Sequence, residues 1–143
     1  TFNDVRPIGD GLNRPESVQV LGDGRLAVSH RGRGVSFVTP DGEVTTRGPE
    51  PALAGGEELI PNGIAPQADG SFLIANIGEG GGIWKLAADG DLTPYLMEVD
   101  GVFLAAANFV MTDEKGRCFI TVSTAVASLS GSSRRRSSVD ALN

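Results

Sequence analysis

Polar and apolar residues recur along this chain with a period of 46 residues. Three segments share one order, in which a polar residue is followed by a short apolar stretch, a glycine and a second apolar stretch. They span residues 14–29 (RPESVQVLGDGRLAVS), 60–75 (IPNGIAPQADGSFLIA) and 106–121 (AANFVMTDEKGRCFIT). The polar residues are Glu16, Asn62 and Asn108, and the glycines are Gly24, Gly70 and Gly116. Two identical spacings indicate a structural repeat rather than chance similarity.

The glycine of each repeat predicts a tight hairpin turn. It is preceded by aspartate in the first two copies, Asp23 and Asp69, and by Lys115 in the third. Asp-Gly pairs accept positive φ angles and close β-hairpins. We therefore expect strand pairs around the three turns, over residues 17–20 and 26–29, 63–65 and 72–75, and 109–112 and 118–122.

Two copies continue into a second hairpin. Asp41-Gly42 separates predicted strands at 35–39 and 44–46, and Asp89-Gly90 separates strands at 83–86 and 92–95. Four short antiparallel strands in each repeat are typical of a β-propeller blade. The predicted fold is all-β, with a partial propeller over residues 1–124 and blades near 14–47, 60–96 and 106–124. A β-sandwich is the main alternative, and a β-solenoid, whose repeats are usually nearer 20–30 residues, is another.

Both ends of the chain depart from the repeat. Residues 2–8 could form one strand before the first copy. The third copy lacks its outer half, and residues 125–143 (AVASLSGSSRRRSSVDALN) carry no turn signal or aromatic residue. We expect this Ser/Arg-rich tail to be disordered, since it contains little that could be buried.

Composition narrows the class of protein. Twenty glycines and eight prolines are too many for a helical bundle. A net charge of −6 disfavours nucleic acid as a partner. No apolar run is long enough to cross a bilayer and no signal peptide is visible, so we expect a cytoplasmic protein without membrane contact. The single cysteine, Cys118, cannot form an internal disulfide and is expected to be a small buried residue.

The repeated segments resemble the senescence marker protein/gluconolactonase family of six-bladed propellers. Pro15-Glu16-Ser17 is similar to the Pro-Glu-Gly of the family's first blade, and Pro61-Asn62-Gly63 to the Pro-Asn-Gly of the second. Ala107-Asn108-Phe109-Val110 is similar to the Asn-Asp-Val that opens the third, with Phe109 in place of the usual aspartate. The resemblance runs from about residue 10 to residue 124.

This resemblance implies a metal-dependent hydrolase of sugar lactones with one divalent cation, calcium first and zinc or manganese as alternatives. It implies that Glu16 is a metal ligand and that Asn108 and Asn62 bind substrate. The remaining ligands, including the aspartate proposed as general base, would come from the fourth and fifth blades beyond residue 143. The catalytic residue is therefore unknown, and we expect the chain to hold part of the site only.

The spacing adds a prediction of its own. Residues at the same point of successive blades begin inner strands, so Glu16, Asn62 and Asn108 should converge on one axis. The alternatives are that the two asparagines bond locally to the backbone and that Glu16 is a solvated charge. The competing function is a non-catalytic propeller fragment or binding module. Its exposed blade faces, with Phe119, Ile120 and Val122 near the break, would allow homo-oligomerisation.

Two further features are assigned structural roles. His30, the single histidine, is expected in a loop after a strand. The glycine-rich run 78–82 (GEGGG) lacks the Lys-Ser/Thr of a phosphate-binding loop, so a flexible loop at a blade edge is expected there.

Overall fold

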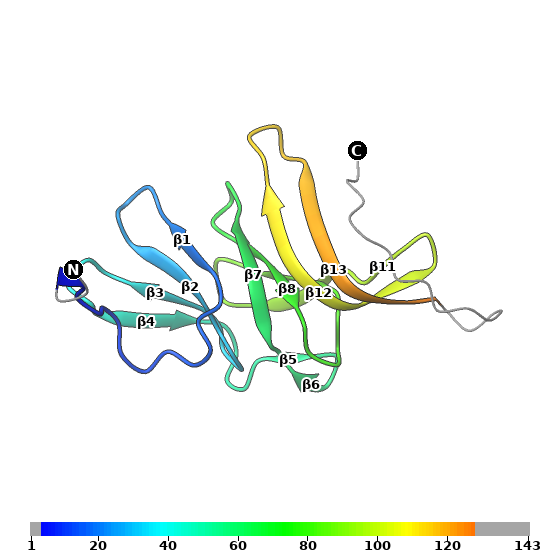
Figure 1. Ribbon diagram of the computed structural model, residues 1–143, viewed down its shortest axis with the longest axis horizontal. Coiled ribbons are helices and arrows are strands. Elements are labelled where there is room, and N and C mark those ends of the chain that lie inside the picture. The colour runs from blue at the N-terminus through cyan, green and yellow to red at the C-terminus, as the bar shows by residue number, and fades with distance from the viewer. Residues whose placement is uncertain (1–3, 128–143) are drawn as a thin grey trace.

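The computed structural model describes residues 4–127, and within that range the chain forms three antiparallel sheets set side by side and a small two-stranded one, without an α-helix (Figure 1). The first sheet contains β1 (Val18–Val20), β2 (Leu26–His30), β3 (Gly34–Val38) and β4 (Val44–Arg47) in chain order. The second contains β7 (Pro61–Pro66), β8 (Phe72–Asn76), β9 (Ile83–Leu86) and β10 (Leu92–Leu96), also in chain order. The all-β prediction is confirmed.

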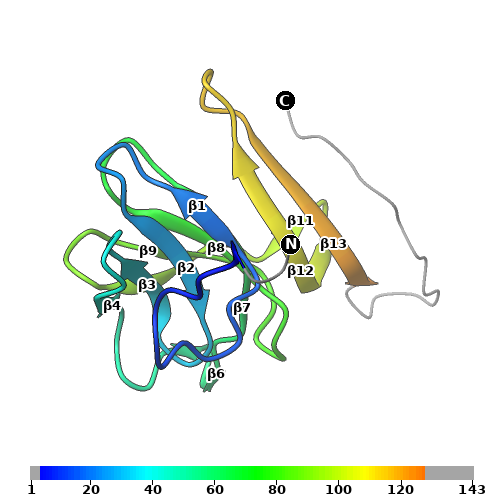
Figure 2. The ribbon, with the colours of Figure 1, turned by 60° about the vertical axis from the view of Figure 1, so that its left-hand side comes forward.

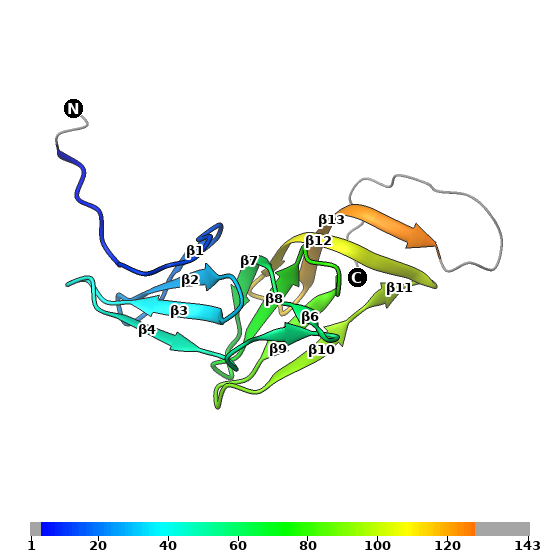
Figure 3. The same cartoon turned by 90° about the horizontal axis from the view of Figure 1, so that it is seen from below.

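The third sheet differs from the first two. It has three strands, β11 (Glu98–Val99), β12 (Val102–Thr112) and β13 (Cys118–Ala127), with β12 in the middle. A short ribbon of β5 (Leu53–Ala54) and β6 (Glu57–Glu58) lies in the connection between the first two sheets. Figure 3, seen from below, shows the three sheets following one another like successive blades of a propeller.

Every predicted strand after residue 16 overlaps an observed one, but β12 is longer than expected. It begins at Val102 instead of residue 109, and it pairs with β13 through several irregularities in register. The alanine run 105–107 gave no strand signal, because alanine is a weak strand former. The pairing of β12 with both neighbours overrides that local preference.

The strand suggested for residues 2–8 is not present in its described part, since residues 4–17 contain no strand. This segment instead runs across the outer face of the first sheet (Figure 2). Gly9 lies so close to Val38 that a β-carbon there would be 3.2 Å from Val38 Cγ1. The segment covers apolar groups of the first sheet without hydrogen-bonding as a strand.

The three repeat turns have the same geometry despite the change of sequence in the third. Gly24, Gly70 and Gly116 have φ angles of 84°, 78° and 75°. In the third turn Asp113 replaces the missing Asp-Gly aspartate, because its Oδ1 accepts hydrogen bonds from the backbone N–H groups of Lys115 and Arg117 at 2.9 Å each. The turn is thus stabilised from a different position in sequence.

The core lies between the sheets. One cluster joins the first sheet, the β5–β6 connection and one face of the second sheet, with Val35, Leu59, Ile64, Ile74 and Leu86 all fully buried. A second cluster joins the opposite face of the second sheet to the third sheet. Strands β7, β8 and β9 of the second sheet are therefore covered on both faces, whereas β10 at its outer edge is mostly exposed. Burial on both faces explains why β8 (FLIAN) is almost entirely apolar.

Ile120, expected near an uncovered face, packs against the second sheet, whereas Phe119 and Val122 are half-buried. Among the side chains of the third sheet that the structure describes, the exposed large apolar ones are Phe109 and Met111, 41% and 47% exposed. The expectation of a flexible glycine-rich loop was wrong. The glycine-rich run is packed instead of loose: Gly81 and Gly82 are buried, and Gly82 N–H donates to the Leu104 carbonyl at 2.7 Å. These glycines are needed for close approach, because a β-carbon at residue 80, 81 or 82 would overlap neighbouring atoms.

Candidate functional site

Two of the three predicted site residues meet directly where the inner strands of successive sheets lie together. Asn62 is in β7 and Asn108 is in β12, 46 residues apart. The Asn62 amide nitrogen donates to the Asn108 backbone carbonyl at 2.9 Å and to the Asn108 Oδ1 at 2.5 Å. These bonds cross between sheets, so they differ from the local asparagine–backbone bonds that were the alternative.

Glu16 joins this group through a residue that sequence reasoning missed. The Arg14 guanidinium donates from Nη1 to Asn62 Oδ1 at 3.5 Å and lies 3.4 Å, from Nη2, to Glu16 Oε1. We call Arg14, Glu16, Asn62 and Asn108 the inner row. A signal for Arg14 was available in the repeat, because the corresponding residues of the other two copies are the apolar Ile60 and Ala106.

The backbone beside Glu16 is fixed by two buried serines. Ser29 Oγ accepts hydrogen bonds from the backbone N–H groups of Glu16 and Ser17, each at 3.0 Å. Ser17 Oγ in turn accepts one from Ile64 N–H of β7 at 3.4 Å. Because buried hydroxyls are costly to leave without partners, these bonds fix how the first inner strand sits against the second.

Close packing of β7 on β12 brings the two asparagines together. Gly63, the residue after Asn62, lies against the backbone of β12: a β-carbon on it would be 2.7 Å from the Phe109 α-carbon and 2.8 Å from the Val110 nitrogen. No side chain larger than hydrogen fits there without movement of the backbone. The glycine of Pro61-Asn62-Gly63 is therefore a packing requirement of the inner row.

The inner row combines one carboxylate, one guanidinium and two carboxamides at a partly exposed surface. The side chains of Arg14 and Glu16 are 31% and 45% exposed. Such a set can donate to and accept from several hydroxyl or carbonyl oxygens at once. It suits a neutral ligand rich in oxygen.

The inner row as it stands does not fit a divalent cation. Its one carboxylate, Glu16, faces a positive guanidinium at 3.4 Å, and the Asn62 oxygen faces the same group. Across residues 4–127 there is no group of three His, Cys, Asp or Glu side chains placed to hold a metal ion. Hard cations need several oxygen ligands to replace their water.

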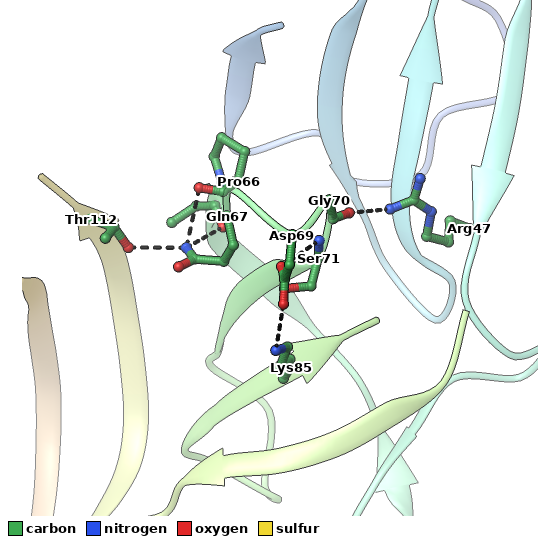
Figure 4. A network of polar contacts seen from close by, with 9 residues as sticks. Arg47, Pro66, Gln67, Asp69, Gly70, Ser71, Lys85 and Thr112 are labelled. Carbon is green, nitrogen blue, oxygen red and sulfur yellow. Dashed lines mark hydrogen bonds and ion pairs between the residues drawn. The ribbon is translucent and has the colours of Figure 1, made fainter. Parts of the chain in front are cut away.

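The other end of β7 carries a second polar network with a structural character (Figure 4). Gln67 donates to Thr112 Oγ1 of the third sheet at 3.0 Å, and Arg47 of the first sheet donates to the Gly70 carbonyl at 2.7 Å. Within the turn, the Ser71 hydroxyl donates a hydrogen bond to the Asp69 carboxylate, and this bond is the main cause of the lowered pKa of Asp69. The Lys85 ammonium, 2.9 Å from Asp69 Oδ2, lowers that pKa further. One turn therefore contacts both neighbouring sheets.

His30 and Cys118 have ordinary structural roles. His30 ends β2, and its Nδ1 lies 2.7 Å from Ser36 Oγ, which in turn lies 2.9 Å from Thr46 Oγ1. Partial burial and, to a smaller extent, the charge of Arg33 lower the pKa of His30. Cys118 is half-buried, and that burial raises the pKa of its thiol.

A shallow surface pocket lies away from the inner row. It measures about 620 Å³ and is lined by blade edges that include Arg25, Arg47, Asp89 and Asp91. Both arginines stack on Phe37, at 5.0 and 4.7 Å from the ring centroid. The geometry of converging inner strands, and not this wide opening, identifies the candidate site.

Comparison with solved structures shows that the fold is shared with gluconolactonases. A gluconolactonase from Xanthomonas campestris superposes with a TM-score of 0.64 at 21% identity, over 80% of this chain and 36% of that chain. A structural-genomics target described provisionally as a gluconolactonase gives 0.55 at 21% identity, over 81% of this chain and 44% of that one. A protein of unknown function from Bacteroides caccae gives 0.54 at 16% identity, over 89% and 46%.

The chain thus spans less than half the length of each of these structures. Neither a protein-family model nor a curated protein matches the sequence. The described residues include no helix long and apolar enough to cross a membrane. The described residues therefore form part of a β-propeller, as the 46-residue repeat predicted.

Proposed function

We propose that this chain forms the first blades of a sugar-lactone hydrolase of the gluconolactonase type and that its inner row binds the lactone. The observation that carries the proposal is the meeting of Glu16, Asn62 and Asn108 through Arg14, in a fold shared with a gluconolactonase. Residues from three repeats form one polar group, although they are separated by 46 residues at each step.

The chemistry of the inner row supports a small polyhydroxylated ligand. Arg14 and the carboxamides can donate to a lactone carbonyl or to ring oxygens, and Glu16 can accept from a ring hydroxyl. These groups position and orient a ligand. Hydrolysis itself needs a general base and an activated water, and the described residues offer no carboxylate at the inner row besides Glu16.

A cation, expected from the resemblance to be calcium, would need ligands in addition to the inner row. Glu16 remains the predicted metal ligand among the described residues, as Asn62 and Asn108 remain the predicted substrate-binding residues. A cytoplasmic location and self-association through exposed sheet faces belong to the same proposal. The tail after residue 127 lies outside the described residues.

The experiment is a titration of the 143-residue chain with freshly dissolved gluconolactone, followed by NMR of the side-chain amides. We expect shifts for Asn62 and Asn108 and weaker binding in Asn108→Ala. Asn13→Ala, which removes an exposed carboxamide outside the inner row, is the matched control. Unchanged Asn62 and Asn108 signals at saturating lactone would contradict the proposal.

A parallel assay of lactone hydrolysis with added calcium, manganese or zinc tests the enzymatic part. We expect little or no turnover by this chain alone. Metal-dependent turnover that disappears in Glu16→Ala would show that these blades are sufficient for catalysis.

A non-catalytic binding module is the second candidate function. It is favoured by one observation, the pairing of Glu16 with Arg14, because that pairing occupies the carboxylate which a metal-dependent hydrolase would use. Saturable lactone binding without turnover at any metal concentration, in a chain extended by the missing blades, would select it.

A further inference from the structure

The guanidinium of Arg14 lies where a bound cation would contact the inner row. It touches Glu16 Oε1 at 3.4 Å and Asn62 Oδ1 at 3.5 Å. Carboxylate and carboxamide oxygens are also the ligands that hard divalent cations prefer. Arg14 and such a cation would therefore need the same oxygen atoms.

The backbone of Arg14 is in an unusual conformation that directs this side chain. Its φ angle is 50°, one of two positive φ values among non-glycine residues in the described range. The left-handed region is unfavourable for arginine, at a cost of about 1 kcal/mol or more. Such outliers often occur where a side chain must be held in one place, and the Arg14 side chain contacts both Glu16 and, in the second sheet, Asn62.

We propose that Arg14 is a resident cation that takes the place of a divalent metal ion at the inner row. Glu16 and Asn62 then pair either with Arg14 or with a metal, and not with both. The inference rests on the proposed function only for the location of the site. Its test is the binding of a cation, which is independent of lactone binding.

Charge explains the expected size of the effect. A guanidinium a few ångströms from a divalent cation repels it, and the side chains here are partly exposed, so solvent screens that repulsion without abolishing it. Removing the charge of Arg14 also frees the Glu16 carboxylate. We expect the two effects together to tighten divalent cation binding about tenfold.

The experiment titrates the full chain with manganese and follows paramagnetic broadening of the Glu16, Asn62 and Asn108 signals. Wild type is expected to bind weakly, Arg14→Gln about tenfold more tightly, and Arg14→Gln combined with Glu16→Gln no more tightly than wild type. Arg117→Gln is the matched control: it removes the same charge from an exposed arginine–carboxylate pair, with Asp113, in the third hairpin. Its manganese affinity at the inner row should equal that of wild type.

Equal manganese affinity in wild type and Arg14→Gln would overturn the proposal. Tight stoichiometric manganese binding by wild type, with Arg14 still bonded to Asn62, would overturn it as well. If Arg14→Gln does not fold, the wild-type chain supplies the test. In wild type, saturating calcium should shift the Arg14 side-chain N–H signals as the guanidinium is displaced, and an unchanged signal at calcium saturation would refute displacement.

The two proposals fail separately. Absence of lactone-induced shifts at Asn62 and Asn108 would remove the proposed function and leave the manganese comparison intact. Absence of an affinity gain in Arg14→Gln, with lactone shifts present, would remove the resident-cation inference alone.

Discussion

Gly63 and Phe109 lie in backbone contact, so that a β-carbon on residue 63 would be 2.7 Å from the Phe109 α-carbon. This contact joins the inner strands of two successive sheets. Asn62 directly precedes Gly63 and Asn108 directly precedes Phe109, so the contact also sets the position of Asn62 relative to Asn108. The approach of two main chains to this distance is possible only because one of the residues is glycine. The packing of the second sheet on the third and the geometry of the candidate site therefore both depend on the close approach of Gly63 to Phe109.

Replacing Gly63 with alanine should destabilise the chain and separate the two asparagines. The added methyl group must displace the backbone of β12, and overpacking of this kind costs about 1–3 kcal/mol. Urea denaturation followed by circular dichroism measures the loss. Gly22→Ala is the control, since a β-carbon there meets no atom within 4 Å. A Gly63→Ala variant as stable as Gly22→Ala would contradict the packing requirement.

Asn76→Ala should be among the most damaging substitutions of a polar residue. The fully buried Asn76 carboxamide accepts from the backbone N–H groups of Ile60 and Gly78 at 2.9 and 3.0 Å and donates to the Gly81 carbonyl at 3.2 Å. Leaving these buried groups without partners should cost about 2–4 kcal/mol. Thermal or urea denaturation checks this value, with the exposed Asn13→Ala expected within about 0.5 kcal/mol of wild type.

Ser71→Ala should raise the pKa of Asp69 more than Lys85→Met does. The hydroxyl of Ser71 is the largest cause of the lowered pKa, and the Lys85 ammonium comes second. Carbon-detected NMR titration of the Asp69 carboxyl measures both shifts directly. The reverse order would mean that the ion pair, and not the turn, controls this group.

The same depressed pKa predicts how stability depends on pH. Because Asp69 ionises more easily in the folded chain, its ionised form stabilises the fold above the pKa of the unfolded chain, about 3.9. That contribution should decrease below about pH 4 and be lost as the pH falls through the folded pKa. The stability difference between wild type and Asp69→Asn, measured from pH 7 down to pH 2, should shrink accordingly.

Arg47→Lys should be nearly as destabilising as Arg47→Met. The Arg47 guanidinium lies 4.7 Å from the Phe37 ring centroid and 5.8 Å from that of Phe72, and it donates to the Gly70 carbonyl at 2.7 Å. A lysine ammonium cannot stack on a ring and reach that carbonyl at once, so we expect a loss of about 1–2 kcal/mol in both variants. Arg31→Lys is the control. Within residues 4–127 the Arg31 side chain forms only an exposed pair with Glu58, so this variant should be as stable as wild type.

The repeat made the sheets predictable from sequence, because turn glycines act locally. Gly24 and Gly70 follow aspartates and must adopt positive φ, and this information lies within two or three residues of each turn. The third turn was predicted from its spacing alone. This turn is stabilised by the Asp113 carboxylate, which accepts a hydrogen bond from the backbone N–H of Arg117. The Asp-Gly pattern does not predict that contact, because Asp113 does not directly precede Gly116.

Features that depend on neighbouring sheets were harder to predict. The sequence around Gly81 and Gly82 predicted a flexible loop, because it gives no sign that Leu104 packs against Gly81 and Met97 against Gly82. The repeat marked Arg14 only as a charged residue at a position that is apolar in the other copies, and its contact with Asn62 depends on the approach of the next sheet. Convergence of the asparagines was predictable from the 46-residue period, whereas the pairing of Glu16 with an arginine was not.

The burial of the second sheet on both faces has a consequence for how the chain opens. The second sheet cannot unfold unless the first and third sheets also lose the apolar contacts that they make with it. The three sheets behave in this respect like a linear array of units that each contact only their neighbours. Amide protons of β8 and β9, the two central strands of that sheet, should therefore exchange with solvent only in the rarest openings, and those at the edges of the outer sheets in frequent local ones. The middle repeat should therefore exchange more slowly than the first and third repeats, although all three share the same sequence pattern.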